Sequence, residues 1–315
     1  MKISVLDVAT LGDDLNFDAI NRLGDVTVYD VTKADEVQER ICDAEVVILN
    51  KVKLNSENLP YAKKLKLICI TATGYDNVDT VYCREHGIAV CNVAGYSTDS
   101  VAQLTAAMAF SLATNLMSFD GFVKSGDYTK SGMFNRIKPV FRDISALTWG
   151  VVGLGNIGTR VAGIAKAAGC RVLAFKRTPV ESYPCVDIDT LCRESDIISL
   201  HTPLCEQTRH LINEERLSMM KKGTILINVA RGNVVDEDAV CRALEDGRLG
   251  GLGVDVYSAE PMQKESPYQR ILDRENVIFT PHMAWGSIDA RQRCMDEVAK
   301  NIESFYDGGK RSRIV

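Results

Sequence analysis

A glycine-rich turn between an apolar run and a helical segment constrains the fold of this chain more than any other feature. The stretch "WGVVGLGNIG" places Gly153, Gly155 and Gly158 in G-x-G-x-x-G spacing after an apolar strand, and a segment of helical period follows. The first glycine permits a tight turn, the second lets backbone approach a pyrophosphate, and the third lets helix and strand pack closely. The helix N-terminus offers free N–H groups to the phosphates. A tight turn that binds nothing is the alternative, and the matching apolar run at 172–175 favours a dinucleotide site.

Apolar runs typical of strands alternate with segments of helical period along the chain. The first third contains the runs "ISVLDV", "VTVYD", "EVVILN", "LKLICIT" and "IAVCN", with helical segments such as 33–42 and 77–86 between them. A second series begins near Trp149, with the runs "WGVVGLG", "CRVLAFK", "DIISLH", "GTILINV", "GLGVDV" and "VIFTP". Such alternation indicates parallel sheets covered on both faces. We therefore expect an α/β protein with two doubly wound parallel-sheet domains, the second made of two βαβαβ halves.

Two long helical segments lie at the junctions of these series. Residues 99–117 are rich in Ala, Ser and Thr, and small side chains let helices approach closely. We expect a linking helix here, and the sequence leaves open whether it packs against a second subunit or is buried within one chain. Residues 287–305 follow the last strand, and a helix there would return the chain to the first domain.

Length and composition exclude several classes of protein. A chain of 315 residues is long enough for two domains. Its net charge of −5 argues against a nucleic-acid binder, which needs a basic face. Apolar runs are too short for a membrane span, and the start "MKISVLDVAT" is too short and too acidic for a signal peptide. The ten cysteines form no C-x-x-C pair and have no zinc-ligand spacing, so we expect reduced thiols, a cytoplasmic protein and no metal site.

The strand after the glycine-rich turn ends in bases where an acid is common. An acid about 20 residues after such a turn accepts hydrogen bonds from the adenosine ribose, but "VLAFKRT" ends in Lys176 and Arg177, with the hydroxyl of Thr178 beside them. Bases at this position attract a 2′-phosphate. The sequence thus favours NADP(H) over NAD(H) as the coenzyme, and the alternative is that both side chains are simply solvated.

Three polar residues of complementary type follow three successive strands of the second series. Arg231, Glu260 and His282 come after the runs that end near residues 228, 256 and 280. Ligands of open α/β sheets bind at this carboxyl edge. Hydride transfer to a ketone needs a proton donor such as His, a carboxylate that favours the protonated His, and an Arg that binds a substrate carboxylate. Each residue alone has a structural explanation, and the joint placement favours the catalytic one.

Seven motifs in order make the sequence resemble the D-isomer-specific 2-hydroxyacid dehydrogenase family. They are "ATGYDNVD", "VCNVAGYSTDSVAQ", "GVVGLGNIG", "DIISLHTPL", "TILINVARGNVVDEDAV", "GLGVDVYSAEP" and "VIFTPHMAW", between about residues 69 and 293. The resemblance implies a discontinuous, flavodoxin-like substrate-binding domain of residues 1–98 and 286–315. It also implies a Rossmann cofactor domain of residues 99–285.

The resemblance also implies roles for individual residues. The catalytic residues would be Arg231, Glu260 and His282. Asp255 would hold the nicotinamide carboxamide. The cofactor would be bound by Gly153, Gly155, Asn156, Ile157, Gly158, Lys176, Arg177, Thr178, His201, Thr202, Ala230 and Asp255. The substrate would be bound by Thr73, Gly74, Tyr75, Arg231, His282 and Trp285, with backbone N–H groups of the first loop on its carboxylate.

The implied activity is reversible, NAD(P)-dependent reduction of a small 2-keto acid to the D-2-hydroxy acid by a homodimer. The motifs are most similar to those of the glycerate dehydrogenase (hydroxypyruvate reductase) branch, so hydroxypyruvate or glyoxylate is the expected substrate. Pyruvate-like and phosphorylated 2-keto acids stay open. The formate-oxidising branch carries Gln where this chain has Glu260, so we do not expect formate oxidation. The alternative from another class is a non-catalytic, NAD(H)-sensing interaction protein of the corepressor type.

Overall fold

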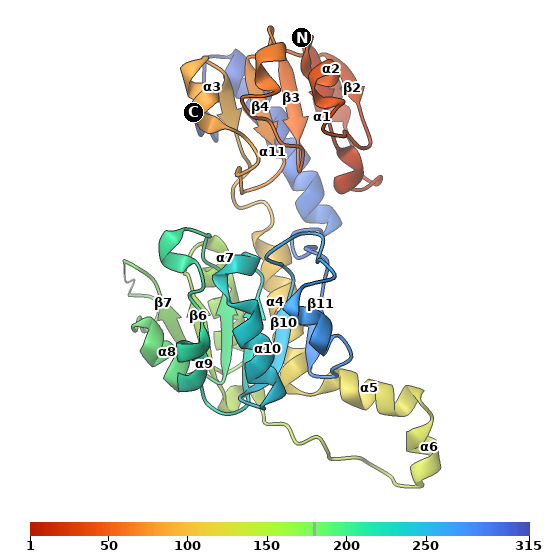
Figure 1. Cartoon of the computed structure of the whole chain (residues 1–315), viewed down its shortest axis with the longest axis vertical. Helices are drawn as coiled ribbons and strands as arrows, with labels where there is room; N and C mark the ends of the chain where they lie inside the picture. The colour runs from red at the N-terminus through yellow and green to blue at the C-terminus, as the bar shows by residue number, and fades with distance from the viewer. Residues whose placement is uncertain (179–180) are drawn as a thin grey trace. The chain divides into compact units, whose positions relative to one another are not determined.

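The computed structural model describes residues 1–178 and 181–315, which form two compact units. The first unit contains residues 1–97 and 285–315, and the second contains residues 98–284. Both units are sheets of parallel strands covered by helices (Figure 1). The predicted α/β class, with two doubly wound parallel-sheet domains, is therefore confirmed.

The first unit has a five-stranded parallel sheet in the order β2-β1-β3-β4-β5. This order is that of flavodoxin-like folds. Its strands are β1 (Lys2–Val5), β2 (Asp25–Val28), β3 (Val46–Leu49), β4 (Leu67–Ile70) and β5 (Ala89–Cys91). Its helices are α1 (Asp18–Asn21), α2 (Val37–Ile41), α3 (Thr80–Glu85) and α11 (Ile288–Tyr306). The helix predicted for 287–305 is thus present as α11, which buries Met295, Val298 and Ile302 against Ile3 and Leu67 of the sheet.

The second unit has a six-stranded parallel sheet in the order β11-β10-β9-β8-β6-β7. Its strands are β6 (Thr148–Val152), β7 (Arg171–Phe175), β8 (Ile197–Leu200), β9 (Thr224–Asn228), β10 (Leu249–Val254) and β11 (Val277–Phe279). Its helices are α4 (Thr98–Ala113), α5 (Leu116–Lys124), α6 (Asp127–Ser131), α7 (Asn156–Ala167), α8 (Ile188–Glu194), α9 (Glu214–Met219) and α10 (Glu237–Glu245). Each of the six runs predicted near Trp149 and beyond is one of these strands.

A single bridge replaces the third strand of the first βαβαβ half. Cys185 forms an isolated parallel bridge with Ala174 on the outer side of β7. The Ala174 N–H donates to the Pro184 carbonyl at 2.9 Å, and the Val186 N–H donates to the Ala174 carbonyl at 2.9 Å. With this bridge as the third element, the sheet follows the dinucleotide-binding order 3-2-1-4-5-6, and β11 extends it.

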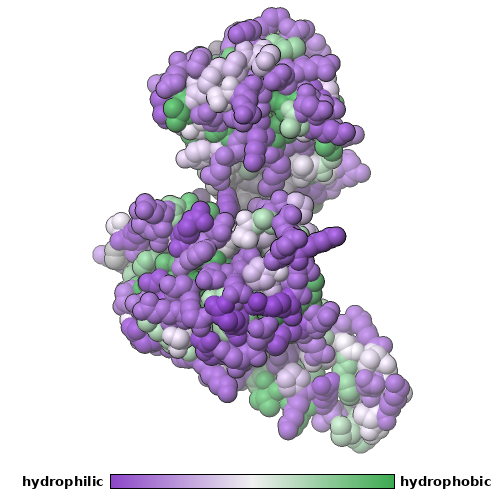
Figure 2. Space-filling view, viewed as in Figure 1, coloured by the Kyte–Doolittle hydropathy of each residue, from purple (hydrophilic) through white to green (hydrophobic). Residues whose placement is uncertain are grey.

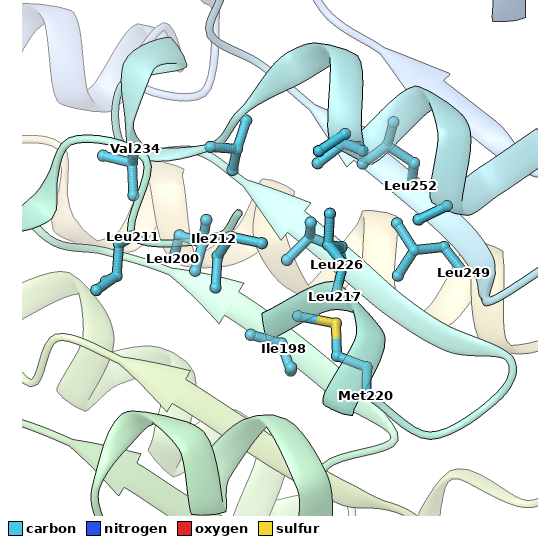
Figure 3. Packing of buried hydrophobic residues seen from close by; sticks show 14 of the residues in the cluster. Ile198, Leu200, Leu211, Ile212, Leu217, Met220, Leu226, Val234, Leu249 and Leu252 are labelled. Carbon is cyan, nitrogen blue, oxygen red and sulfur yellow. The ribbon is translucent and has the colours of Figure 1, made fainter. Parts of the chain in front are cut away.

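Both faces of the second sheet are covered by apolar side chains. Ile197, Ile225 and Ile227 face α4 and α7. Their neighbours in sequence, Ile198 and Leu226, belong to the apolar cluster on the face that α8, α9 and α10 cover. Figure 3 shows these two residues packed with other members of that cluster. Successive side chains of a strand point to opposite faces, so strands buried on both sides need continuous apolar runs such as "TILIN".

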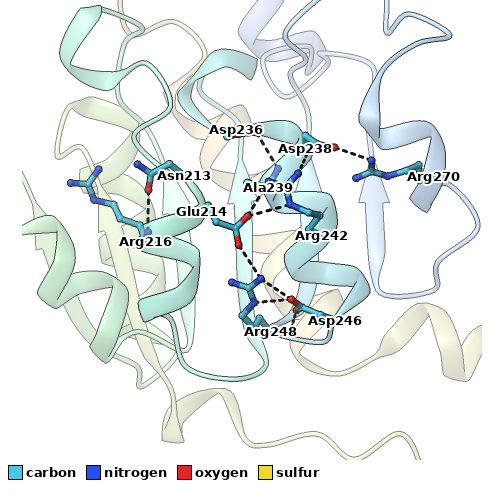
Figure 4. Close-up of polar contacts among 10 residues, drawn as sticks. All are labelled: Asn213, Glu214, Arg216, Asp236, Asp238, Ala239, Arg242, Asp246, Arg248 and Arg270. Carbon is cyan, nitrogen blue, oxygen red and sulfur yellow. Dashed lines mark hydrogen bonds and ion pairs between the residues drawn. The ribbon is translucent and has the colours of Figure 1, made fainter.

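An ion-pair network joins the outer surfaces of α9 and α10 (Figure 4). Glu214 accepts hydrogen bonds from Arg242 and Arg248, each at 3.0 Å, and Arg270 pairs with Asp238 at 2.8 Å. The arginine contacts lower the pKa of the Glu214 carboxyl. Exposed pairs contribute little individually, so the network fixes how the two helices meet more than it stabilises the fold.

The helix predicted for 99–117 ends earlier than expected. It is α4, which ends at Ala113, because Asn115 takes a left-handed conformation with φ of 53°. The chain then forms α5 and α6 and an extended segment before β6. We call residues 116–143 the arm. The sequence analysis did not predict it.

Candidate active site

The carboxyl ends of β9, β10 and β11 carry Arg231, Glu260 and His282 in the second unit. Arg231 directly precedes the 3-10 turn Gly232–Val234. The buried Asn228 side chain holds this loop, since its Oδ1 accepts from the Ala230 N–H at 3.1 Å and its Nδ2 donates to the Arg231 carbonyl at 2.9 Å. A fixed backbone at Arg231 limits the positions that its guanidinium reaches.

His282 and Glu260 form a close pair. Nδ1 of His282 lies 2.6 Å from Oε2 of Glu260. The other carboxylate oxygen of Glu260, Oε1, accepts the Tyr257 N–H at 3.2 Å. A carboxylate at Nδ1 keeps the proton on that nitrogen, which assigns proton exchange with a ligand to Nε2. The structure therefore brings together the two residues from which the sequence predicted an acid–base pair.

A buried carboxylate fixes the loop that carries His282. Asp255 accepts hydrogen bonds from Thr280 Oγ1 at 2.6 Å, Met283 N at 2.8 Å and Ala284 N at 3.0 Å. Burial raises the pKa of Asp255 although these donors favour its charged form. His282 has a φ of 52°, a conformation that costs a non-glycine residue about 1–3 kcal/mol and persists only where the surroundings impose it. The clamp at Asp255 supplies that constraint.

A second buried carboxylate, missed by the sequence analysis, fixes the loop that carries Glu260. Glu237 accepts hydrogen bonds from the Ser258 N–H at 2.7 Å and the Ser258 hydroxyl at 2.9 Å. Gly232 packs against the same loop so tightly that a Cβ there would lie 2.0 Å from the Tyr257 carbonyl carbon. The Arg231 and Glu260 loops are thus locked together. Glu237 begins a helix, a position where acids are usually exposed and act on the helix dipole, so its burial has no signal in the sequence.

The glycine-rich turn has the geometry that a dinucleotide needs. Gly153 has a φ of 96°, and a Cβ on Gly158 would lie 1.8 Å from the Gly153 carbonyl oxygen. A Cβ on Gly155 would meet nothing within 4 Å, so the backbone there is open to a ligand. Helix α7 begins at Asn156 and Ile157, and its N–H groups face the same turn.

The candidate 2′-phosphate-binding bases lie beside this turn. The Gly153 N–H donates to the Phe175 carbonyl at 2.9 Å, which ties the end of β7 to the turn. Lys176 is half-buried, and Arg177 and Thr178 are exposed. On the other side of β6, His201 and Thr202 follow β8, and Ala230 follows β9. The residues after β7, β6, β8 and β9 therefore succeed one another along one sheet edge.

The remaining candidates belong to the first unit. Thr73, Gly74 and Tyr75 follow β4. Their loop is held by the Asn92 side chain, which donates to the Thr73 carbonyl at 2.7 Å, and by the Thr73 hydroxyl, which donates to the Val93 carbonyl at 3.1 Å. Trp285 packs edge-on against Tyr96, with ring centroids 6.5 Å apart.

Residues 1–178 and 181–315 contain neither a metal-binding cluster nor a membrane-spanning helix. Within these ranges, no group of three or more His, Cys, Asp and Glu side chains is placed to hold a metal ion. No helix of the same ranges is long and apolar enough to cross a membrane.

Comparison of the sequence with known proteins gives one family. Residues 106–284 match the model of the D-isomer-specific 2-hydroxyacid dehydrogenase NAD-binding domain. The chain is 38% identical over 274 residues to glycerate dehydrogenase of Methylorubrum extorquens, covering 87% of this chain and 86% of that enzyme. It is 33% identical over 317 residues to hydroxypyruvate reductase of Blautia hydrogenotrophica, covering 98% of both.

Solved structures give the same result. The fold is similar to that of D-lactate dehydrogenase from Aquifex aeolicus complexed with NAD and lactic acid (TM-score 0.84, 33% identity, 98% of this chain and 96% of that one). It is also similar to an acyclic imino acid reductase in complex with NADPH and D-Arg (TM-score 0.88, 30% identity, all of both chains). The protein belongs to the D-isomer-specific 2-hydroxyacid dehydrogenase family, oxidoreductases that act on CH–OH donors with a nicotinamide cofactor.

Proposed function

We propose that the protein reversibly reduces a small 2-keto acid, with hydroxypyruvate or glyoxylate favoured, to the D-2-hydroxy acid. The observation that carries the proposal is the His282–Glu260 pair at 2.6 Å, with the Glu260 loop locked to that of Arg231. Relatives named glycerate dehydrogenase and hydroxypyruvate reductase support this substrate class. Because the relatives carry the names of enzymes, they favour catalysis over the corepressor role that the sequence left open.

Each of the three residues has one task in this reaction. A reduced nicotinamide coenzyme, held by the residues around the glycine-rich turn, would supply the hydride for the keto carbon. His282 donates a proton from Nε2 to the oxygen that becomes the hydroxyl, and takes it back in the oxidative direction. Glu260 holds the ring by Nδ1 and stabilises the charged imidazolium. Arg231 binds the substrate carboxylate and polarises the carbonyl.

In this proposal the coenzyme-binding residues belong to the second unit, and the loop that binds the substrate carboxylate belongs to the first. The second unit holds the coenzyme through the Gly153–Gly158 turn, with Asn156, Ile157, Ala230 and Asp255 nearby. The first unit binds the substrate carboxylate through backbone N–H groups of Thr73, Gly74 and Tyr75, and Trp285 limits the size of the substrate. The hydrogen bonds that hold the 73–75 loop support this role, because a rigid loop presents its N–H groups at fixed positions.

The coenzyme that we propose is NADP(H). Lys176 and Arg177 follow β7, whose last carbonyl is bonded to the glycine-rich turn, which supports a role for their side chains at the 2′ position of an adenosine bound there. Thr178 adds a hydroxyl donor. A relative of this fold has been solved with NADPH, and another with NAD.

A panel of 2-keto acids, each with NADH and with NADPH, tests the proposal. We expect oxidation of the reduced coenzyme, followed by its absorbance, with hydroxypyruvate or glyoxylate as the best substrate. Pyruvate and phosphorylated 2-keto acids cover the alternatives. Binding of coenzyme without turnover of any 2-keto acid would favour a sensor.

Glu260→Gln is expected to lower kcat about 10–100-fold. Glutamine keeps the shape of the side chain but removes the charge that stabilises the imidazolium, a loss of about 1.4–3 kcal/mol. The measurement is kcat for hydroxypyruvate. An unchanged kcat would contradict the pairing.

We also propose a homodimer, built on α4 and the arm. Apolar side chains of the arm lie in water, among them Phe134 (98% exposed), Ile137 (76%) and Val140 (76%). Figure 2 shows apolar side chains grouped on the arm. Between α4 and α7 the surface has a depression lined by Ala106, Phe110 and Ile164, which is a suitable place for such side chains of a second copy. Large exposed apolar patches mark protein interfaces.

Phe134→Asp combined with Ile137→Asp is expected to convert the protein to a monomer, because charged groups cannot be buried unpaired in an interface. Light scattering measures the mass. Thr129→Asp, at an exposed polar position of the same arm, is the control and should leave the dimer intact. A wild-type monomer of 34.7 kDa would contradict the proposal.

A further inference from the structure

Three side chains form a hydrogen-bonded row on the face of the second sheet that α4 and α7 cover. Nε1 of Trp149 lies 2.9 Å from Oγ of Ser199, and Nε2 of His201 lies 3.0 Å from the same oxygen. Trp149 and Ser199 are fully buried. Ser199 and His201 are two residues apart along β8 and its extension, so their side chains share this face. The row ends at the carboxyl edge of the sheet.

The row bears on which nitrogen of His201 carries the proton. An indole N–H only donates, so the Ser199 oxygen accepts from Trp149. The direction of the bond between Ser199 and Nε2 of His201 depends on the tautomer of the ring, because a hydroxyl oxygen can also accept a second hydrogen bond. Ser199 makes no third hydrogen bond within residues 1–178 and 181–315, so its proton is paired when it is donated to Nε2, and the proton of the neutral ring is then on Nδ1. Burial lowers the pKa of His201 to about 3, which keeps the ring neutral.

Nδ1 of His201 is buried and has no hydrogen-bond partner among the residues that the structure describes. The hydroxyl oxygen of Thr202 is buried and unpartnered in the same part of the chain. Native proteins rarely leave buried polar groups unpaired, and two neighbours in this state indicate a ligand that supplies the missing partners.

The strand order identifies the part of the ligand that lies there. His201 follows β8, and the strand order reverses between β6 and β8, where ligands of doubly wound sheets bind. The turn after β6 would hold the pyrophosphate, and the loops after β9, β10 and β11 carry Arg231, Glu260 and His282. The ribose that joins the pyrophosphate to the nicotinamide would lie between the two.

We infer that His201 donates a hydrogen bond from Nδ1 to an oxygen of the nicotinamide-side ribose, and that Trp149 and Ser199 are positioning residues that fix this tautomer. The inference rests on the proposed coenzyme site. It adds Nδ1 of His201 as the donor, a ribose oxygen as the acceptor, and Trp149 and Ser199 as the residues that orient the ring.

Two substitutions of His201 test whether Nδ1 is the donor, because each puts a side-chain amide at the position of a different ring nitrogen. An asparagine amide reaches the position of Nδ1, whereas a glutamine amide reaches that of Nε2. We expect His201→Asn to keep the Kd for NADPH within about threefold and His201→Gln to raise it about tenfold, the effect of one lost hydrogen bond. Binding of 2′,5′-ADP, which lacks the nicotinamide half, should be equal in both variants. Equal losses of NADPH affinity in both variants, an equal loss for 2′,5′-ADP, or no coenzyme binding by the wild type would overturn the inference.

Nitrogen-15 NMR of histidine-labelled protein without coenzyme tests the tautomer independently of binding and turnover. The chain has four histidines, so the His201→Asn variant assigns the signal. In the wild type, Nδ1 should carry the proton and the signal should not titrate between pH 5 and 9. Ser199→Ala should produce a mixture of tautomers and weaken NADPH binding several-fold. A wild-type ring protonated on Nε2 would refute the positioning role even if NADPH binds and hydroxypyruvate is reduced.

Discussion

Replacing His282 with alanine is expected to lower kcat for the reduction of hydroxypyruvate by about 10²–10⁴-fold, the usual contribution of a positioned general acid. Alanine removes the proton donor while Glu260 and Arg231 stay on their loops, which Glu237 and Asn228 hold. Steady-state kinetics at saturating coenzyme measures the loss. The Kd for NADPH, measured by fluorescence, should change by less than threefold.

His210→Asn is the matched control for that variant. His210 is also an exposed-loop histidine with positive φ (48°), a conformation that asparagine tolerates well. Its kcat should stay within about twofold of the wild type, since it makes no part of the proposed site. If His282→Ala turned over hydroxypyruvate nearly as fast as the wild type, the proton donor would have to be another group.

Lys176→Asp combined with Arg177→Ala is expected to shift the preference from NADPH toward NADH by about 10²-fold. A charge-assisted hydrogen bond contributes about 1.5–3 kcal/mol, so two lost contacts with a 2′-phosphate have an effect of this order. The new aspartate accepts from the ribose hydroxyls instead. The measurement is the ratio of kcat/KM for the two coenzymes.

Lys166→Asp combined with Arg171→Ala makes the same change in net charge elsewhere on the second unit. Lys166 is exposed on α7, and Arg171 begins β7 at the opposite edge of the sheet. This control should leave the coenzyme ratio unchanged. If the Lys176 and Arg177 variant also left it unchanged, these side chains would be solvated strand ends, and the reaction class would stand without the NADP(H) assignment.

The periodicity of apolar residues was enough to predict both sheets, because strands buried on two faces need continuous apolar runs. One pairing that it missed is the bridge at Cys185, where a single residue pairs with Ala174 and no run exists. The arm could not be predicted either. Its apolar residues are exposed in the single chain, so nothing in the order of its own residues indicates what they pack against.

The site shows a similar limit. The ends of the strands were enough to predict where Arg231, Glu260 and His282 lie, because the carboxyl ends of all strands in a parallel sheet meet at one edge. The contacts that hold the site residues in place depend instead on the register of the strands and on the path of each loop. Trp149 pairs with Ile197 across the sheet, so its ring reaches Ser199 diagonally. Glu237 meets Ser258 only because two loops fold together.

Reduction of hydroxypyruvate with coenzyme deuterated at nicotinamide C4 tests the central claim most directly, with NMR and chiral separation of the product. The account predicts D-glycerate with deuterium on C2 when both hydrogens at nicotinamide C4 are replaced. L-glycerate, a racemic product, or the absence of deuterium from C2 would contradict it.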